Sequence, residues 1–225
     1  MSDLFRSICA VLLVGSILSF GWMCRAQDHR GEVQEKQLLL KVGEFSKRWF
    51  FFSADKDVRF NDTWTLKYGK DNSKVILVCD GTPFGYIRTI DVYENFEFGF
   101  EWNFPTDENG NSGILIHTSA VGAKKSEDDK IWPKSIQVQL HRPKAGSIFK
   151  IAGAMTDNKV DVMGLSKPVS QWNSGLITCK DGTISVDING KKVGEVTGCN
   201  PKKGTIALQS EGSVIHFRNI WVKNL

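Results

Sequence analysis

Five side chains that could exchange protons or bind hydroxyl groups stand at alternating positions in three short segments. A carboxylate and two imidazoles are the usual general acids and bases near neutral pH. Glutamine amides hydrogen-bond hydroxyl groups well but cannot give or take a proton. Together these residue types favour acid–base chemistry or binding on a hydroxyl-rich substrate such as a sugar. The residues are Glu101, His117, Gln137, Gln139 and His141.

The segments that carry these residues, 94–104, 113–117 and 135–141, alternate apolar and polar side chains every second residue. This period is that of a β-strand with one buried face. The apolar positions are expected between two sheets, and a one-residue change of register would bring the polar positions into the core instead. If the three strands are neighbours, the five polar residues line one outer face of one sheet. The expected core positions are Phe98, Phe100, Trp102, Ile114, Ile116, Ile136, Val138 and Leu140.

The rest of the chain from Trp49 onward also indicates β-structure, with about ten or more short strands and no long helical period. Asp181-Gly182 and Asn189-Gly190 separate three of these strands. Both dipeptides tolerate the positive φ values of tight hairpin turns. We therefore predict an all-β, single-domain, two-sheet antiparallel sandwich or jelly roll. No linker or internal repeat divides it.

Composition excludes several classes of protein. The 225 residues are 41% hydrophobic and 24% charged, which is ordinary for a globular domain. The net charge of +4 is scattered rather than gathered into a patch, so no nucleic-acid partner is expected. The chain also has no Gly-rich dinucleotide fingerprint after a strand, so it is not expected to oxidise a substrate with a nicotinamide cofactor.

The amino-terminal segment is typical of an export signal. Residues 7–24 carry no charge and follow Arg6, and Cys24-Arg25-Ala26 offers small residues at the positions that a signal peptidase requires. We expect a signal peptide over residues 1–26, a lead-in segment over 27–42 and the domain over 43–225, in a periplasmic or secreted protein. The alternative is an uncleaved anchor, in which case only this leader contacts a membrane.

Removal of the leader would leave three cysteines, Cys79, Cys179 and Cys199. Cys179 and Cys199 flank a hairpin and could form a disulfide, but buried free thiols are about equally expected. Oxygen-rich runs at 107–111 and 128–129 could hold a calcium ion. Neither run has the spacing of an established calcium loop, and turn chemistry is favoured.

Several stretches in the right order resemble the family of 3-keto-disaccharide hydrolase domains, which have a concanavalin A-like jelly-roll fold. The resemblance spans Trp49 to Leu225. It implies an enzyme that acts on 3-keto-glycosides, with a separate sugar 3-oxidoreductase supplying the oxidised substrate. Elimination from C2 and C1 followed by addition of water would cleave the glycosidic bond. No cofactor is firmly implied, a divalent metal such as calcium being one option. The matching stretches are 77–89, 93–97 with Glu101-Trp102, 111–114, 131–140, 208–212 and 217–220.

The expected site follows from the outward-facing positions of the predicted strands and from the family resemblance together. Glu101, His117 and His141 are expected to transfer protons, and Gln137 and Gln139 to bind the sugar. Arg88 could equally form a structural ion pair, and Trp132 could instead cover the core. Glu211 and Arg218 are interpreted as structural, with Arg218 pairing across a sheet. The residues expected at the rim of the site are Tyr86, Arg88, Trp132 and Lys134.

Two departures from the family pattern keep a second hypothesis open. Gln137 stands where the family usually has Glu before Val-Gln-Leu, and Ser147 stands where it often has Asp after Gly. Each departure removes a carboxylate. If the missing Glu is catalytic, the chain is instead a non-catalytic carbohydrate-binding domain.

Overall fold

A computed structural model describes residues 34–69 and 74–225. The expected leader and the first part of the lead-in segment lie outside the described residues. Within the described ranges, no helix is long and apolar enough to cross a membrane.

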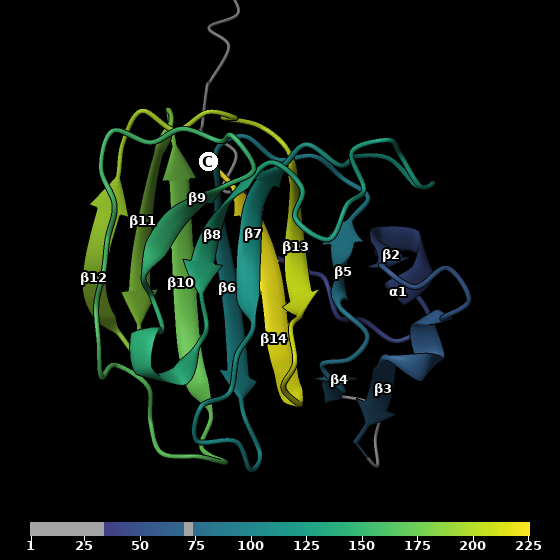
Figure 1. The fold of residues 1–225 in the computed structure, drawn as a ribbon. Helices are drawn as coiled ribbons and strands as arrows, with labels where there is room; N and C mark the ends of the chain where they lie inside the picture. Colours follow the sequence, from purple (N-terminus) through teal and green to yellow (C-terminus); the bar gives the residue numbers. More distant parts are fainter. Residues whose placement is uncertain (1–33, 70–73) are drawn as a thin grey trace, which may run out of the picture. The chain divides into compact units, whose positions relative to one another are not determined.

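The described chain folds into two antiparallel sheets (Figure 1). One sheet has the order β12-β11-β10-β6-β14-β4-β3, with β1 also paired to β14, and the other has the order β2-β5-β13-β7-β8-β9. The first sheet consists of β1 (Gln37–Leu38), β3 (Trp64–Tyr68), β4 (Val75–Cys79), β6 (Phe96–Asn103), β10 (Asn173–Lys180), β11 (Thr183–Ile188), β12 (Lys191–Val196) and β14 (Ile215–Asn224). The second consists of β2 (Trp49–Ser53), β5 (Gly85–Thr89), β7 (Gly113–Thr118), β8 (Ser135–Gln139), β9 (Ile148–Ile151) and β13 (Thr205–Ser210).

In the described part of the chain, helical structure is confined to single turns between strands. The helix α1 (Phe45–Arg48) precedes β2, and 3-10 turns occupy Phe60–Asp62 and Arg142–Lys144. The architecture confirms the predicted all-β, two-sheet sandwich.

The predicted core positions are confirmed. All eight residues named from the alternation are buried and belong to one apolar cluster that joins the two sheets. In Figure 1, β7, β8 and β9 lie in front of β6, β10 and β11, with this core between them. The predicted hairpin turns are confirmed too, because Asp181 and Asn189 both have positive φ, at 51° and 52°.

The expected adjacency of the polar strands is wrong. β6, which carries Glu101, lies between β10 and β14, whereas β7 and β8 belong to the opposite sheet. The two sheets present their polar rows to opposite sides of the sandwich, since both turn their apolar rows toward the shared core.

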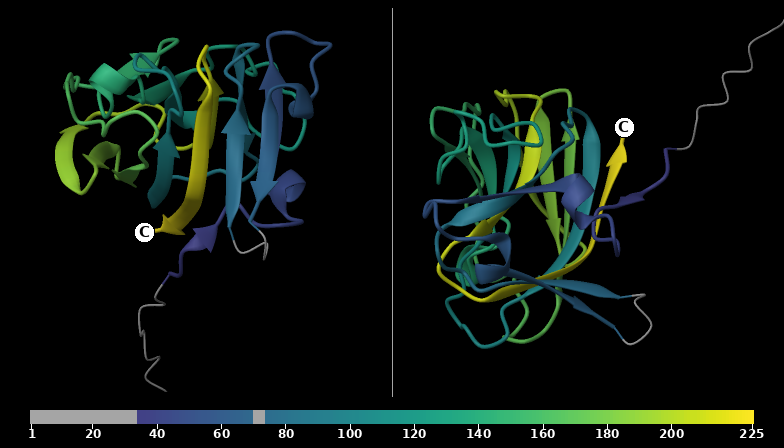
Figure 2. Two further views of the ribbon diagram at one scale, coloured as in Figure 1. Left: turned by 90° about the horizontal axis from the view of Figure 1, so that it is seen from below. Right: turned by 90° about the vertical axis from the view of Figure 1, so that its right-hand side faces the viewer.

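The amino-terminal part of the described chain belongs to the sandwich. β1 pairs with β14, as the left view in Figure 2 shows, and the next two residues, Leu39 and Leu40, are buried in the core. The end of the expected lead-in segment is therefore integral to the domain. Cys79, Cys179 and Cys199 are all buried free thiols, so no disulfide closes the Cys179–Cys199 hairpin.

Candidate functional site

The outer face of the six-stranded sheet carries a row of amide side chains. Across β7 and β8, Gly113 pairs with Gln139 and Leu115 pairs with Gln137. The Gln137 Nε2 donates a hydrogen bond to the Gln139 Oε1 at 3.2 Å. On the neighbouring β13, Gln209 is only 1% exposed, and neither its Nε2 nor its Oε1 has a partner. A buried amide without protein partners is costly, so its donor and acceptor are suited to binding a polar ligand.

Gly113 makes room for these amides. A Cβ atom at this position would lie 2.1 Å from the Gln209 Oε1 and 2.7 Å from the Gln137 Nε2. Side chains from the strands on either side therefore converge over the glycine backbone, and any larger residue would push them apart.

The row continues past the strand ends to a carboxyl group and an imidazole. The antiparallel pairing of β7 with β8 continues beyond the strand ends, so that His141 lies opposite Asn111. Leu140 N donates to Ser112 O and Arg142 N donates to Gly110 O, both at 2.9 Å. Beside Asn111 lies Glu211, which follows β13 directly. His141 thus follows Gln137 and Gln139 along one segment, and its backbone N–H donates to the Gln139 Oε1, while Asn111, Gln209 and Glu211 belong to the neighbouring segments.

Glu211 has the electrostatics of a proton-transfer group. Burial raises the pKa of Glu211 to about 7, and hydrogen bonding from the Asn111 side chain counteracts this only in part. The Glu211 Oε2 and the Asn111 Oδ1 both lack a partner. A carboxyl group with a pKa near the working pH is present in both protonation states and can serve as either base or acid. Glu211, interpreted from the sequence as structural, takes part in no ion pair among the described residues.

Two aromatic rings lie near the end of β13, Phe84 against Gly212 and Trp132 beside Phe84. Trp132 and Phe84 are 39% and 42% exposed, and their ring centroids are 6.5 Å apart at a steep angle. The Phe84 ring also lies against Gly212, the residue after Glu211, at 3.8 Å from a Cβ built there. Exposed aromatic faces beside hydrogen-bonding groups suit a sugar, which has apolar C–H faces and hydroxyl edges. Trp132 is exposed, and its expected place at the rim of the site and its role in binding stay predictions.

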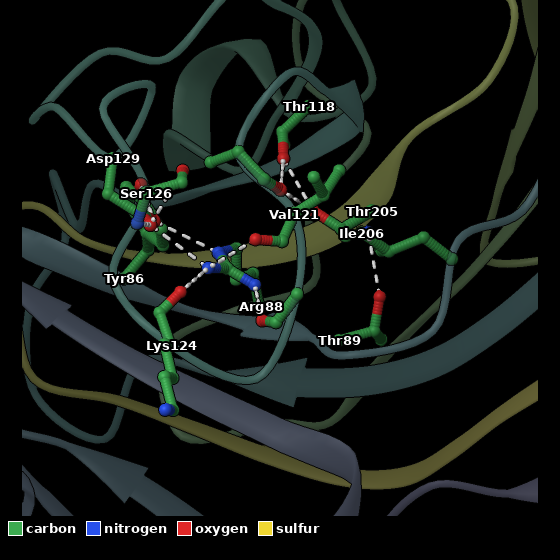
Figure 3. A network of polar contacts seen from close by, with 12 residues as sticks. Tyr86, Arg88, Thr89, Thr118, Val121, Lys124, Ser126, Asp129, Thr205 and Ile206 are labelled. Atoms are coloured by element: carbon green, nitrogen blue, oxygen red, sulfur yellow. Dashed lines mark hydrogen bonds and ion pairs between the residues drawn. The ribbon is translucent and has the colours of Figure 1, made fainter.

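A buried ion pair holds the loop that carries Trp132. Within the loop 119–134, Asp129 accepts hydrogen bonds from Arg88 Nε and Nη2, both at 2.9 Å, and from the Tyr86 hydroxyl at 2.8 Å (Figure 3). The Arg88 guanidinium also donates to the carbonyl oxygens of Val121, Gly122 and Lys124. These contacts join β5 to the loop 119–134, next to the amide row.

This network corrects two of the expected rim residues. Tyr86 and Arg88 are both fully buried, and their polar groups are engaged by Asp129 and by carbonyl oxygens of the loop, so they are not available to a substrate. Alternation does place them on the outer face of β5, but the loop 119–134 covers that part of the face. The alternative of a structural ion pair for Arg88 is confirmed. Lys134 is half-buried at the start of β8, where its carbonyl oxygen accepts a hydrogen bond from Ser119 N.

His117 does not lie on the outer face. The pairing of β7 with β13 shifts by one residue between Thr205 and Ala207, and His117 has a positive φ of 54°. Such a bulge reverses the alternation locally. The ring is 1% exposed, packs edge-on against Phe96 of the core at 5.5 Å, and donates from Nε2 to the Glu94 carbonyl oxygen. Burial lowers its pKa. The expected catalytic role rested on a shared face, and that premise is wrong.

Glu101 is separated from the amide row by the thickness of the sandwich. Its Oε2 accepts from Arg218 Nε and its Oε1 from Asn219 Nδ2, both at 2.7 Å. The expected cross-sheet pairing of Arg218 is confirmed, and its partner is Glu101 itself. Glu101 therefore cannot act in the same site as His141.

The oxygen-rich runs are engaged in internal hydrogen bonds. The Asp107 Oδ1 accepts from Asn109 N at 2.9 Å and its Oδ2 from the Ser213 hydroxyl at 2.7 Å, while Asp129 is occupied by Arg88. Over residues 34–69 and 74–225, no three His, Cys, Asp or Glu side chains are grouped as metal ligands.

Solved structures with the same fold include proteins that act on or bind carbohydrates. A Parabacteroides distasonis protein assigned provisionally as a glycosyl hydrolase is 23% identical, with a TM-score of 0.59 over 85% of this chain and 100% of its own. A Bacillus licheniformis β-glucanase is 9% identical, with a TM-score of 0.54 over 87% and 100%. The carbohydrate-binding module CBM66 of Bacillus subtilis is 11% identical, with a TM-score of 0.53 over 78% and 95%. At these identities the likeness shows the shared fold.

No curated protein matches the chain. The sequence model of one family does match, over residues 52–223, and this covers nearly all of the described sandwich. That family is the one whose motifs the sequence resembles. The chain belongs to the 3-keto-alpha-glucoside-1,2-lyase-like domain family, and its function is related to glycosides.

Proposed function

We propose that this protein is an enzyme that cleaves the glycosidic bond of 3-keto-glycosides, with Glu211 as the group that transfers the proton at C2. The observation that carries the proposal is the Glu211 carboxyl, whose pKa is raised to about 7 by burial next to unpartnered polar side chains. Family membership supplies the substrate class.

The chemistry requires a base, an acid and a group that holds negative charge. A ketone at C3 acidifies the C2–H bond, so the Glu211 carboxylate removes that proton and the electron pair passes toward the C3 oxygen as an enolate. Collapse of the enolate expels the C1 substituent, which leaves with a proton as an alcohol or a free sugar. Water then adds across the C1–C2 double bond, and the proton returns to C2. The net reaction is hydrolysis, with no change of oxidation state.

The neighbouring side chains suit the remaining roles. His141, on the same row as Glu211, is the proposed donor of the proton to the leaving oxygen. The Gln209 Nε2, buried and without a partner, is the proposed hydrogen-bond donor to the developing enolate oxygen. Gln137 and Gln139 are proposed to hold sugar hydroxyls, and Trp132 with Phe84 to contact the ring beside Glu211.

The same proposal includes the source of the substrate. Because the mechanism needs a ketone that this chain does not itself introduce, a separate sugar 3-oxidoreductase must supply it. The expected leader would place the reaction outside the cytoplasm, and amino-terminal sequencing of the exported protein tests cleavage before Gln27.

Incubation of the purified protein with a chemically oxidised 3-keto-disaccharide, followed by assay of the released sugar, tests the function. We expect turnover by the wild type and a loss of about 10²- to 10⁴-fold in Glu211→Gln, the usual effect of removing a general base. Glu195→Gln is the matched control, because Glu195 lies on the edge strand β12 and pairs only with Lys192 on the surface.

The amide at Gln137 favours the second candidate, a carbohydrate-binding domain without catalysis. Gln137 is 2% exposed and bonded to Gln139, so this position holds no proton-transfer group. Under that alternative the wild type binds the keto-disaccharide by calorimetry without releasing sugar, and Gln137→Glu restores turnover.

A further inference from the structure

The outer face of the eight-stranded sheet presents a second set of polar and aromatic side chains, on the side of the sandwich away from Glu211. Glu101 is held between Arg218 and Asn219, and the Arg218 guanidinium lies 4.0 Å from the ring centroid of Trp172. These groups are fixed by one another before any ligand arrives.

Three hollows follow one another across this face. The first, of about 290 Å³, is lined by Arg218, Asn219 and neighbouring residues of β4 and β1. The second, of about 190 Å³, shares Asn219 with the first and is lined by Glu101, Ser174 and Trp221. The third, of about 350 Å³, shares Ser174 with the second and reaches Asp187.

The hollows lie across adjacent strands rather than along one. They involve β4, β14, β6, β10 and β11, which are consecutive in the sheet order. With about 4.8 Å between neighbouring strands, the track is roughly 19 Å long. Such a track suits a ligand that is extended and runs perpendicular to the strands.

Local backbone features shape the track at its centre. Gly99 has no side chain, and the Trp221 indole lies in that space, within 2.4 Å of where a Cβ would stand. The pairing of β14 with β6 shifts between Arg218 and Trp221, and Asn219 in this bulge has a positive φ of 50°. Bulges of this kind redirect side chains and are common beside functional sites.

We infer that this track is a second carbohydrate-binding site, which holds an extended, uncharged polysaccharide apart from the site around Glu211. Hydrogen-bonding groups from Glu101, Ser174 and Asn219 beside an indole match a hydroxyl-rich chain. The site does not depend on the turnover proposed above.

The charges and the strand pairing exclude other extended ligands. The charged residues that line the hollows, Lys74, Arg218, Glu101 and Asp187, sum to zero. Lys36, whose ammonium lies 3.9 Å from the Trp221 ring centroid, adds one positive charge, which is little for a nucleic acid or a polyanion. A peptide adds to a sheet through an unpaired strand edge. β10, β6 and β14 are paired on both sides, so their edges are not available.

Native gel electrophoresis in the presence of hydroxyethyl cellulose, an extended neutral glucan, tests the site. We expect the polymer to retard the wild type. Ser174→Arg fills the central hollow from an exposed position and should weaken the apparent affinity by about fivefold or more, the effect of losing at least one hydrogen bond. Trp221→Leu, which removes the indole, should have the same effect. Ser185→Arg is the matched control, because Ser185 lies on β11 outside the hollows.

The results separate the two sites. Trp132→Ala, on the six-stranded sheet, should leave retardation by the polymer unchanged, and Ser174→Arg should leave turnover of a 3-keto-disaccharide unchanged. The inference is overturned if the polymer does not retard the wild type, or if Ser174→Arg and Trp221→Leu are both retarded as strongly as the wild type. It is also overturned if Trp132→Ala is the only variant whose retardation is lost. Failure of the wild type to turn over substrate would count against the proposed function and not against this site.

Discussion

Replacement of Asp129 by Asn should be among the most destabilising conservative substitutions in this protein. Asp129 and Arg88 are both fully buried, and the carboxylate accepts hydrogen bonds at each oxygen. Its Oδ1 faces the Tyr86 hydroxyl and Arg88 Nε, and its Oδ2 faces Arg88 Nη2 together with the Ser126 backbone and hydroxyl groups. Whichever way the asparagine is turned, its NH₂ group meets donors instead of acceptors.

The magnitude follows from the burial of the pair. Breaking one partner of a buried ion pair leaves the other charge uncompensated, which costs about 3–5 kcal/mol of unfolding free energy. For a domain of this size that corresponds to a fall in Tm of about 6–20 °C. The exposed Lys144–Asp161 pair, at 3.3 Å, provides a matched control, and Asp161→Asn should cost about 1 kcal/mol or less.

Urea unfolding followed by tryptophan fluorescence measures both variants. Burial by itself would raise the pKa of Asp129, but hydrogen bonds from Arg88, Ser126 and Tyr86 hold it below the ordinary value of 3.8. The stabilisation is therefore complete above pH 3.8 and is lost as the pH falls through the lower pKa of the folded state. Equal costs for Asp129→Asn and Asp161→Asn at pH 7 would refute the argument that the pair anchors the loop 119–134.

Four further predictions concern the six-stranded sheet. Burial raises the pKa of Glu211 from 4.5 to about 7, so the folded state holds the proton more tightly than the unfolded state. The wild type should therefore lose stability relative to Glu211→Gln as the pH rises from 4.5 to 7. Urea unfolding midpoints of the two proteins that stay parallel over this range would contradict the prediction. The rate of sugar release by the wild type should rise as the pH rises through about 7, because Glu211 must lose its proton to act as a base, and this rise should be absent in Glu211→Gln. Gly113→Ala should displace the Gln209 amide and weaken binding of the keto-disaccharide roughly tenfold, measured by calorimetry; unchanged affinity would remove Gln209 from the site. His117→Phe should keep full turnover but lose about 1 kcal/mol of stability, because the hydrogen bond to the Glu94 carbonyl oxygen is removed. A loss of turnover in a folded variant would instead show that His117 belongs to the catalytic site.

The alternation in sequence was sufficient to predict the fold class and the core. Side chains in a strand point to opposite faces at a period of two whatever the strand pairs with, so Phe98, Ile114 and Val138 could be placed in the interior without knowing the topology. The turn dipeptides at 181–182 and 189–190 act through their own φ preferences and are equally local. His141, Gln137 and Gln139 lie near one another because they belong to one segment.

The grouping of the rest of the site depended on contacts between distant segments. Glu101 was separated from His141 because β6 pairs with β10 and β14, which lie more than 70 residues later in the chain. Arg88 was removed from the surface because the loop 119–134 folds back over β5. Glu211 acquired its raised pKa from burial, which no residue beside it in the sequence indicates.

By itself, the sequence determined which residues face the core along the regular stretches of the strands, the all-β class and the family, because these depend on local periodicity and on motifs. Only the tertiary structure decided which sheet each strand joins, where a bulge reverses the alternation at His117, and which outward side chains the loop 119–134 covers. The physical reason is that strand pairing, bulges and burial are set by hydrogen bonds and packing between segments far apart in the chain.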